Sequence, residues 1–204
     1  MPMGSVTNAD TVRRWAKTGA TQRRILDAAT EVFAARGFTA ATMAEVVAKS
    51  GASIGSIYHH FGGKSELFLA IFEQVVDDAE RRIETAIQHA CRSGPDGIDQ
   101  RQALQLHVRA YLEAMWHNRC RARVLSSGDA PAGFETVRRN RMKAACRRWP
   151  AMLQSDTSLR GQLLGRVLMA IMGEASLMIA DCENPADVGP IIDAAIEWTG
   201  RLTE

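Results

Sequence analysis

The chain has 204 residues, of which 46% are hydrophobic and 24% are charged, a composition ordinary for a globular protein. This length is long for one domain and short for two large ones. Its start lacks an apolar secretory segment, no stretch approaches the length of a membrane span, and the four cysteines form no C-x-x-C pair. We therefore expect a reduced, cytoplasmic protein with no membrane partner.

The net charge of +2 is unevenly distributed along the chain. Residues 1–64 carry eight Lys and Arg against four Asp and Glu, a net charge of +4. Residues 65–158 carry +2, and residues 159–204 carry −4. A positive end suits a surface that binds phosphates, although this magnitude alone does not identify a nucleic-acid binder.

The chain begins with a polar stretch without periodicity, residues 1–19, which predicts a flexible N-terminal arm. Its Arg13, Arg14 and Lys17 suit an arm that follows DNA, but a disordered tail whose charges solvate it is the simpler interpretation. Residues 21–36 then carry apolar side chains at 25, 26, 29, 32 and 33, a helical stripe that should end at Gly37.

Two short helices should follow. Thr42 and Glu45 have the spacing of a capping box, in which each side chain bonds the other residue's backbone N–H. Gly51 supplies a residue free to take a positive φ where that helix stops. Ser53 is placed to N-cap a second helix, from Ile54 to about His60. Two short helices joined by a tight turn containing glycine predict a helix-turn-helix, whose second helix enters a DNA groove.

The second helix carries side chains suited to close contact with a duplex. Small residues let the backbone approach, hydroxyls can bond phosphates or base edges, and Ile54 can touch a thymine methyl. Tyr58 offers an O–H to phosphate, and Lys64 should bind phosphate beside the N-terminal amides of the next helix. The expected DNA-binding residues are Thr42, Ser53, Ile54, Gly55, Ser56, Tyr58, His59, His60 and Lys64.

The string S-I-G-S-I-Y-H-H-F-G-G-K, residues 53–64, resembles the S-x-G-x-[LI]-Y-x-H-F-x-x-K signature of the TetR family of bacterial transcription regulators. The resemblance extends back to about Ala20 and so covers roughly the first third of the chain. Val47 stands where the family usually has Ala, and Ala52 where it usually has Val, a compensated exchange of volume. The resemblance implies an all-α protein with a three-helix DNA-binding domain, here residues 20–64, and a helical effector-binding and dimerisation domain, here residues 65–204.

The second domain should begin with one long helix from Lys64 to about Cys91, followed by a loop at residues 93–97. Further helices are predicted over residues 100–118, 119–125 and 134–153, the last with a break near Pro150. Six cations between Arg138 and Arg148 suit either a solvated basic surface or a site for an acidic effector.

Two apolar helices should close the chain. The first covers residues 159–181, and the second has its cap and first turn at Asn184, Pro185 and Asp187 and its apolar stripe from Val188 to Leu202. Their apolar surface exceeds what one small bundle can bury, which suggests a subunit interface. The resemblance implies the same, because members of the family dimerise through their last two helices. The expected homodimer interface contains Leu164, Leu168, Ile171, Ile192 and Ile196.

The resemblance also implies that the second domain holds a small apolar or amphipathic molecule, whose binding moves the DNA-binding heads apart. Pockets of this kind are mostly apolar with a few polar groups. The expected ligand-binding residues are His107, Tyr111, Met115, Trp116, Met152, Met169 and Met172. The alternative is that all of these side chains are ordinary core.

An enzyme is not indicated. The sequence has no phosphate-binding Gly-rich loop and no G-x-S-x-G turn, and His59 and His60, as helix neighbours, point in different directions. Arg119 and Arg121 beside Cys120 suit redox sensing, but buried structural thiols are the simpler interpretation. We expect no catalytic residue, no cofactor and no metal.

The predicted function is a homodimeric repressor released from a palindromic operator by a small molecule. The alternatives are a ligand-binding or adaptor protein with an idle DNA head, and a ligand-independent regulator or activator.

Overall fold

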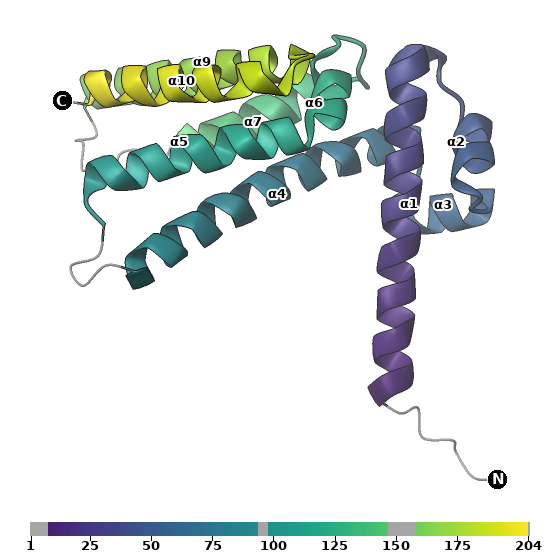
Figure 1. Ribbon diagram of the computed structural model, residues 1–204. Helices are drawn as coiled ribbons and strands as arrows, with labels where there is room; N and C mark the ends of the chain where they lie inside the picture. Colours follow the sequence, from purple (N-terminus) through teal and green to yellow (C-terminus); the bar gives the residue numbers. More distant parts are fainter. Residues whose placement is uncertain (1–7, 94–97, 147–157, 204) are drawn as a thin grey trace. The chain divides into compact units, whose positions relative to one another are not determined.

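A computed structural model describes residues 8–93, 98–146 and 158–203, and all regular structure in these ranges is helical (Figure 1). The chain forms two compact units, which divide after Ile71. The first two turns of the long helix therefore belong to the first unit, because Leu67, Phe68 and Ile71 are fully buried there. The all-α fold expected from the sequence is confirmed.

The first unit contains α1 (Asn8–Ala40), α2 (Met43–Ser50), α3 (Ile54–Phe61) and the start of α4 (Lys64–Ser93). Helix α1 is longer than expected, because residues 8–19 were assigned to a flexible arm and instead have helical backbone. Lengthening an existing helix is inexpensive, since each added residue makes one hydrogen bond without a new nucleus.

Gly37 interrupts α1, as its position in the sequence predicts. Its φ of 76° and ψ of 166° are non-helical, and a positive φ is a conformation that glycine adopts without steric cost. The kink turns Phe38 back onto the helix, where its ring centroid lies 5.8 Å from Phe33 and 5.4 Å from Phe68. This aromatic cluster joins α1 to α4 within the first unit.

The second unit is a bundle formed by the rest of α4, α5 (Gln100–His117), α6 (Arg119–Ser126), α7 (Phe134–Cys146), α9 (Leu159–Asp181) and α10 (Val188–Leu202), with a 3₁₀ turn, η1 (Pro185–Asp187), before α10. Helices α9 and α10 lie side by side and both pack on α5 (Figure 1). The predicted bounds agree within two residues for α4, α5, α6 and α9, while the expected first turn of the last helix is the separate 3₁₀ turn η1. The expected break near Pro150 lies outside the described residues.

Two of the five expected interface residues belong to the core of the subunit itself. Leu168 is fully buried and Ile192 is 3% exposed, and both pack in a cluster formed by α4, α5, α9 and α10. Leu164, Ile171 and Ile196 are half-buried against the same cluster. The apolar side chains that α9 and α10 leave exposed are Leu159, Leu163, Val167, Leu177, Met178, Trp198 and Leu202. The sequence pattern could not distinguish the core-facing side of α9 from its exposed side, because apolar residues occur almost all round this helix.

Within the described ranges, α9 is the one helix long and apolar enough to cross a membrane, with a mean hydropathy of 1.7 over its most apolar window. The expectation that no stretch approaches a membrane span is corrected to this extent. Length and composition alone are weak grounds for a span, because core helices of ordinary bundles also meet them. Here Leu168, Met172 and Ile179 of α9 form part of the buried core, and 33% of the apolar window is buried.

Candidate nucleic-acid interface

The capping box predicted for α2 is present and complete. The backbone N–H and the hydroxyl of Thr42 both donate to Glu45 Oε2, each over 2.9 Å, while the Glu45 N–H donates to Thr42 Oγ1 over 3.3 Å. These hydrogen bonds, the backbone one first, lower the pKa of Glu45, and Arg36, 3.2 Å away, lowers it further. Gly51 ends α2 with a φ of 64°. The Thr42 hydroxyl therefore already makes two hydrogen bonds with Glu45. The expected DNA contact of Thr42 would have to use the same oxygen.

Helix α3 is fixed at both ends by the residues that the sequence singled out. Ser53 Oγ accepts from the Ser56 N–H over 3.1 Å and caps the start. Gly62, with a φ of 96°, ends the helix. Ile57 is fully buried and anchors α3 to the rest of the unit. The orientation of α3 is thus determined by two caps and one buried side chain.

The outer surface of α3 carries large side chains that the fold does not bury. Tyr58 is 51% exposed and Ile54 is 46% exposed. Ser53, Gly55 and His59 are exposed, while Ser56 and His60 are half-buried. A Cβ at Gly55 would meet nothing within 4 Å, so packing within the protein does not require glycine there. A small residue at this position instead keeps the helix surface low for a partner that approaches from outside.

Lys64 has a different environment from the one expected. Its ammonium donates to the carbonyl oxygens of Phe38, Thr39 and Ala41 over 2.9, 3.1 and 2.9 Å. It also lies 4.6 Å from the centroid of the Phe38 ring. An ammonium has three N–H donors and all three are used here. These contacts place the ammonium at the start of α4 in the protein without DNA, and the expectation that Lys64 binds phosphate stays a prediction.

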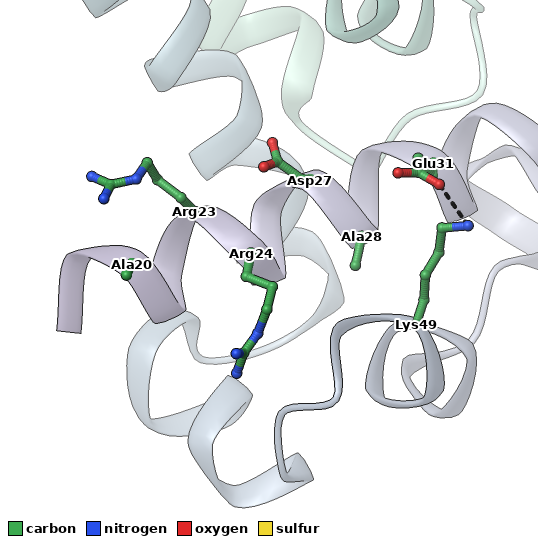
Figure 2. A pocket seen from close by; sticks show the side chains of 7 residues that line it. All are labelled: Ala20, Arg23, Arg24, Asp27, Ala28, Glu31 and Lys49. Atoms are coloured by element: carbon green, nitrogen blue, oxygen red, sulfur yellow. Dashed lines mark ion pairs between the residues drawn. The ribbon is translucent and has the colours of Figure 1, made fainter. Parts of the chain in front are cut away.

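A shallow hollow of about 360 Å³ lies between α1 and α2 in the same unit, and Figure 2 shows its charged lining. Arg23 and Arg24 extend from α1 in different directions, while Lys49 of α2 reaches back to pair with Glu31. Asp27 completes the charged lining. The hollow is a mixed-charge surface, in which Arg23 and Arg24 suit either a contact with phosphate or a solvated face.

Comparisons with known proteins agree with this geometry. The family model described as "Bacterial regulatory proteins, tetR family" matches residues 25–71, from α1 through both short helices to the start of α4. A solved TetR-like transcriptional regulator from a Rhodococcus species superposes with a TM-score of 0.64 at 24% identity, over 90% of this chain and 93% of its own. Over residues 25–71 the chain thus matches the TetR family of bacterial regulatory proteins, and over most of its length it shares the fold of a solved TetR-like regulator.

Curated relatives match only part of the chain. The "HTH-type transcriptional activator FasR" of Mycolicibacterium smegmatis is 33% identical over 52% of this chain and 45% of its own length. The "HTH-type transcriptional repressor AcnR" of Corynebacterium efficiens is 38% identical over 33% of this chain and 35% of its own. The chain thus matches less than half the length of these curated relatives. A solved regulator from Aquifex aeolicus, 18% identical with a TM-score of 0.67 over 87% of this chain and 96% of its own, supports the fold alone.

The residues expected to bind a ligand in the second unit are largely brought together. Met115 and Met172 are buried in the core cluster, and Tyr111, Trp116 and Met169 pack against it. Burial raises the pKa of Tyr111, and a hydrogen bond with Ser176 partly offsets this. His107 is half-buried on α5, and Met152 lies outside the described residues. This arrangement fits the core interpretation directly, while a ligand would require these side chains to move apart.

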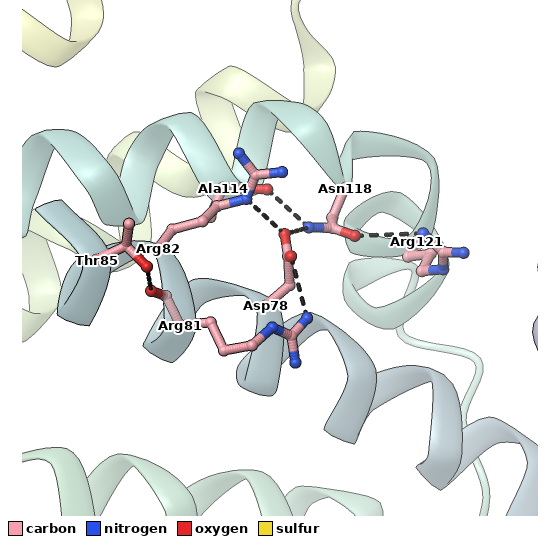
Figure 3. A network of polar contacts seen from close by, with 7 residues as sticks. All are labelled: Asp78, Arg81, Arg82, Thr85, Ala114, Asn118 and Arg121. Carbon is pink, nitrogen blue, oxygen red and sulfur yellow. Dashed lines mark hydrogen bonds and ion pairs between the residues drawn. The ribbon is translucent and has the colours of Figure 1, made fainter. Parts of the chain in front are cut away.

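A polar network in the second unit has no counterpart in the sequence analysis. Figure 3 shows Asp78 of α4 accepting hydrogen bonds from Arg82 Nε over 2.8 Å, from Arg81 and from the side-chain amide of Asn118. Burial alone would raise the pKa of Asp78, but the hydrogen bonds from Arg82 and Asn118 outweigh it and hold the pKa below its ordinary value. Three α4 residues of this network, Asp78, Arg81 and Arg82, also line an open groove of about 770 Å³. Its opposite wall is formed by Leu106, Ala110 and Glu113 of α5.

The other sites considered from the sequence can be placed briefly. Within the described ranges, no cluster of three His, Cys, Asp or Glu side chains is arranged to hold a metal ion. Cys120 is exposed, so the expectation of a buried thiol is wrong for it, because it lies on the outward face of its helix; Cys91 is exposed as well. On α7, Arg138 pairs with Glu135 and Arg141 pairs with Glu73, which favours the solvated basic surface.

Proposed function

We propose that this chain is a homodimeric DNA-binding transcriptional repressor in the cytoplasm, released from a palindromic operator by a small molecule. The observation that carries the proposal is the surface of α3. A helix fixed by two caps presents Ile54 and Tyr58 to solvent beside Gly55, which has open space around it. Exposed large side chains on a rigid helix-turn-helix suit direct contact with base edges in a major groove.

The dimer part of the proposal is supported by the exposed apolar positions of α9 and α10. Leu159, Leu163 and Val167 recur every four residues along one side of α9, and Trp198 and Leu202 have the same spacing on α10. Apolar surface gathered on neighbouring helices marks an interaction site. A two-fold dimer also suits the DNA, because one short helix contacts few base pairs and two contact a palindrome.

The ligand part rests on the group around Tyr111. Its buried hydroxyl, bonded to Ser176, supplies a polar anchor within a mainly apolar cluster that contains Met115, Met169 and Met172. Methionines repack easily, so this part of the bundle suits a small apolar or amphipathic molecule. We propose that such a molecule inserts here and lowers the affinity for DNA.

A second candidate is a transcriptional activator. The similarity to the activator FasR extends over 52% of this chain, beyond the DNA-binding unit, whereas the similarity to the repressor AcnR extends over 33%. The two candidates share every DNA contact and differ in what the bound protein does to transcription. Transcription in vitro from a promoter that contains the operator separates them, because a repressor lowers the transcript yield and an activator raises it.

The first experiment measures binding of the purified protein to fluorescent DNA from upstream of its own gene, with scrambled duplex of equal length as the control. We expect tighter binding to the upstream DNA by roughly a thousandfold or more, with an affinity that falls steeply as salt rises. If the protein binds both duplexes equally, the next step is to select its binding sites from a pool of random DNA sequences. If no sequence is enriched there, the head is idle and the adaptor alternative holds.

The effector is tested on the same complex. Release of the labelled operator is followed while small apolar and amphipathic compounds are added, with a Tyr111→Phe variant as the matched control. A true ligand anchored by the Tyr111 hydroxyl should release the wild-type complex at a lower concentration than the variant. Compounds that act on both proteins at equal concentration do not use this anchor.

A further inference from the structure

The outward side of α9 is exposed along the whole length of the helix in the part of the chain that the structure describes. Residues at three-to-four-residue spacing line this side, and each of them is exposed: Leu159, Leu163, Val167, Ala170, Glu174, Leu177 and Asp181. The opposite side of α9 packs in the core of the second unit. A long and mainly apolar exposed surface of this kind marks a place where another molecule packs.

The charged side chains of α9 are segregated by sign along the helix. Arg160 and Arg166 lie in its first half, and Glu174 and Asp181 lie in its second half. These four are all the charged residues of α9, and all four are exposed. None of them makes an ion pair or a side-chain hydrogen bond with another described residue. The subunit itself therefore leaves both signs of charge on this helix without partners among the described residues.

This order of charges is the reverse of the order that an α-helix favours. The aligned peptide dipoles make the N-terminus partly positive and the C-terminus partly negative, so acids are stabilised at the start and bases at the end. Arg160 is the second residue of α9, and Asp181 is the last. Opposite charges supplied by another molecule would offset the unfavourable placement at both ends.

A second α9 that runs antiparallel to the first supplies these charges at the required places. Arg166 and Glu174 lie four positions before and four positions after Ala170. Arg160 and Asp181 lie ten positions before it and eleven positions after it. In an antiparallel two-fold contact centred on Ala170, each residue before the centre faces a residue equally far after it in the other copy. Each arginine thus faces an acid, whereas a parallel pairing would place like charges opposite each other.

The apolar residues of the same surface have the same symmetry. Leu163 and Leu177 lie seven positions on either side of Ala170, so an antiparallel contact places each leucine opposite the other. Val167 would face Gly173, where a Cβ would meet nothing within 4 Å. The small side chain of Ala170 at the centre lets the two helix backbones approach closely. Charge and shape therefore indicate one register.

We propose that α9 packs antiparallel against α9 of a second copy of this chain, with the two-fold axis beside Ala170. Arg166 of each copy pairs with Glu174 of the other, and Arg160 pairs with Asp181. The inference deepens the dimer part of the proposed function and rests on it. The ion pairs fix the register and favour a second copy of this chain over a helix whose charges have another order.

Reversing the charges of the inner pair tests the register. Arg166→Glu places an acid opposite Glu174 on both sides of the axis, and Glu174→Arg places two arginines opposite each other. We expect each variant to raise the dimer Kd, measured by sedimentation equilibrium, by roughly tenfold or more. An equimolar mixture of the two variants should form heterodimers, and the double variant should form homodimers, both with a Kd close to that of wild type. Lys143→Glu is the matched control, since it reverses an exposed charge on α7.

Disulfide cross-linking gives an independent measurement of the register. In a background where the exposed Cys91 and Cys120 are replaced by serine, Ala170→Cys should link two copies under mild oxidation, because both residues lie beside the axis. Leu163→Cys should not, since the same position in the antiparallel copy lies about 20 Å away along the helix. A parallel pairing would give cross-links at both positions. The serine background without either new cysteine is the control.

Three results would overturn the inference while the wild-type protein is a dimer. These are an unchanged Kd in both single variants, a double variant that stays as weak as the single ones, and efficient cross-linking through Leu163→Cys. Each of them leaves the homodimer of the proposed function in place and removes only the antiparallel α9 contact. A wild-type protein that stays monomeric would overturn the dimer part of the proposed function together with this inference.

Discussion

The carboxylate of Asp78 accepts a hydrogen bond of 2.8 Å from the side-chain amide of Asn118, forty positions further along the chain. Asn118 is 4% exposed, and its amide also donates to the Ala114 carbonyl, while its oxygen accepts from Arg121. The junction between α5 and α6 is thereby tied to the middle of α4. A buried polar side chain that is fully satisfied in this way specifies one arrangement of its neighbours.

Replacing Asp78 by Asn should destabilise the second unit. The new amide would face the N–H donors of Arg82 and Asn118, and losing a charged hydrogen-bond acceptor costs roughly 1–3 kcal/mol. The pKa of Asp78 is held below its ordinary value of 3.8, so its contribution is present above that pH and is lost as the pH falls through the lowered pKa. Urea unfolding should show a gap between wild type and variant at pH 7 that narrows below about pH 4. The exposed neighbour Asp77 provides the control variant, Asp77→Asn. A gap that stays constant down to pH 3 would show that the Asp78 charge is not what stabilises the junction.

Substitutions on α3 should separate sequence recognition from general DNA binding. Ile54→Ala should reduce the penalty for a mismatched base pair at one operator position from about 1–3 kcal/mol toward zero. Tyr58→Phe should weaken binding to all sequences, because the proposed contact is made by the phenolic O–H. Binding to a set of operators with single base changes measures both effects. Uniform weakening by Ile54→Ala would contradict base recognition, and full affinity in Tyr58→Phe would remove the hydroxyl from the interface.

A charge on the outer side of α9 should prevent dimer formation. Val167 is 37% exposed in the middle of that helix, and Val167→Glu places an unpaired carboxylate in the proposed interface. Sedimentation should give a dimer for wild type and a monomer for this variant at micromolar concentration. Met142→Glu on α7 is the control, since Met142 is 40% exposed and lies on another helix. A dimeric Val167→Glu protein would move the interface elsewhere. Ile171 is less suited to this test, because it is half-buried against the core and a glutamate there would also disturb folding.

The capping box of α2 should contribute measurably to the stability of the first unit. Thr42→Ala removes the oxygen that accepts from the Glu45 N–H, and loss of an N-cap costs about 1 kcal/mol. Thr42→Ser retains that oxygen and should behave like wild type in thermal unfolding followed by circular dichroism. Equal melting temperatures for the Ala and Ser variants would show that the cap is dispensable.

The features predicted correctly from the sequence are those whose partners lie within a few residues. Thr42 and Glu45 are three positions apart, and Ser53 bonds the Ser56 N–H, so the residue types and their spacing specify the contacts. Gly37 and Gly51 were predictable for a related reason. A positive φ is a local requirement that few residues other than glycine meet without strain.

The features that the sequence did not predict depend on partners far along the chain. Lys64 bonds carbonyls 23 to 26 positions earlier, and Asp78 bonds a side chain 40 positions later. A lysine at the start of a helix looks the same in the sequence whether it faces phosphate or a carbonyl. Leu168 and Val167 are neighbours of similar apolar character, yet one is fully buried and the other is exposed. Only the packing of α9 against α5 and α10 distinguishes them.

The exposed apolar side of α9 links the abundance of the protein to its stability. A chain without a partner leaves Leu163, Val167 and Leu177 in water, where each square ångström of apolar surface forgoes about 25 cal/mol of stabilisation. By mass action, the proposed second copy stabilises the folded state more as the protein concentration rises, so the melting temperature should increase on concentrating the sample. In a cell that makes little of this protein, more chains would then remain monomeric, and these less stable chains would be degraded faster. A low rate of synthesis would therefore lower the abundance of the protein by more than the change in synthesis alone.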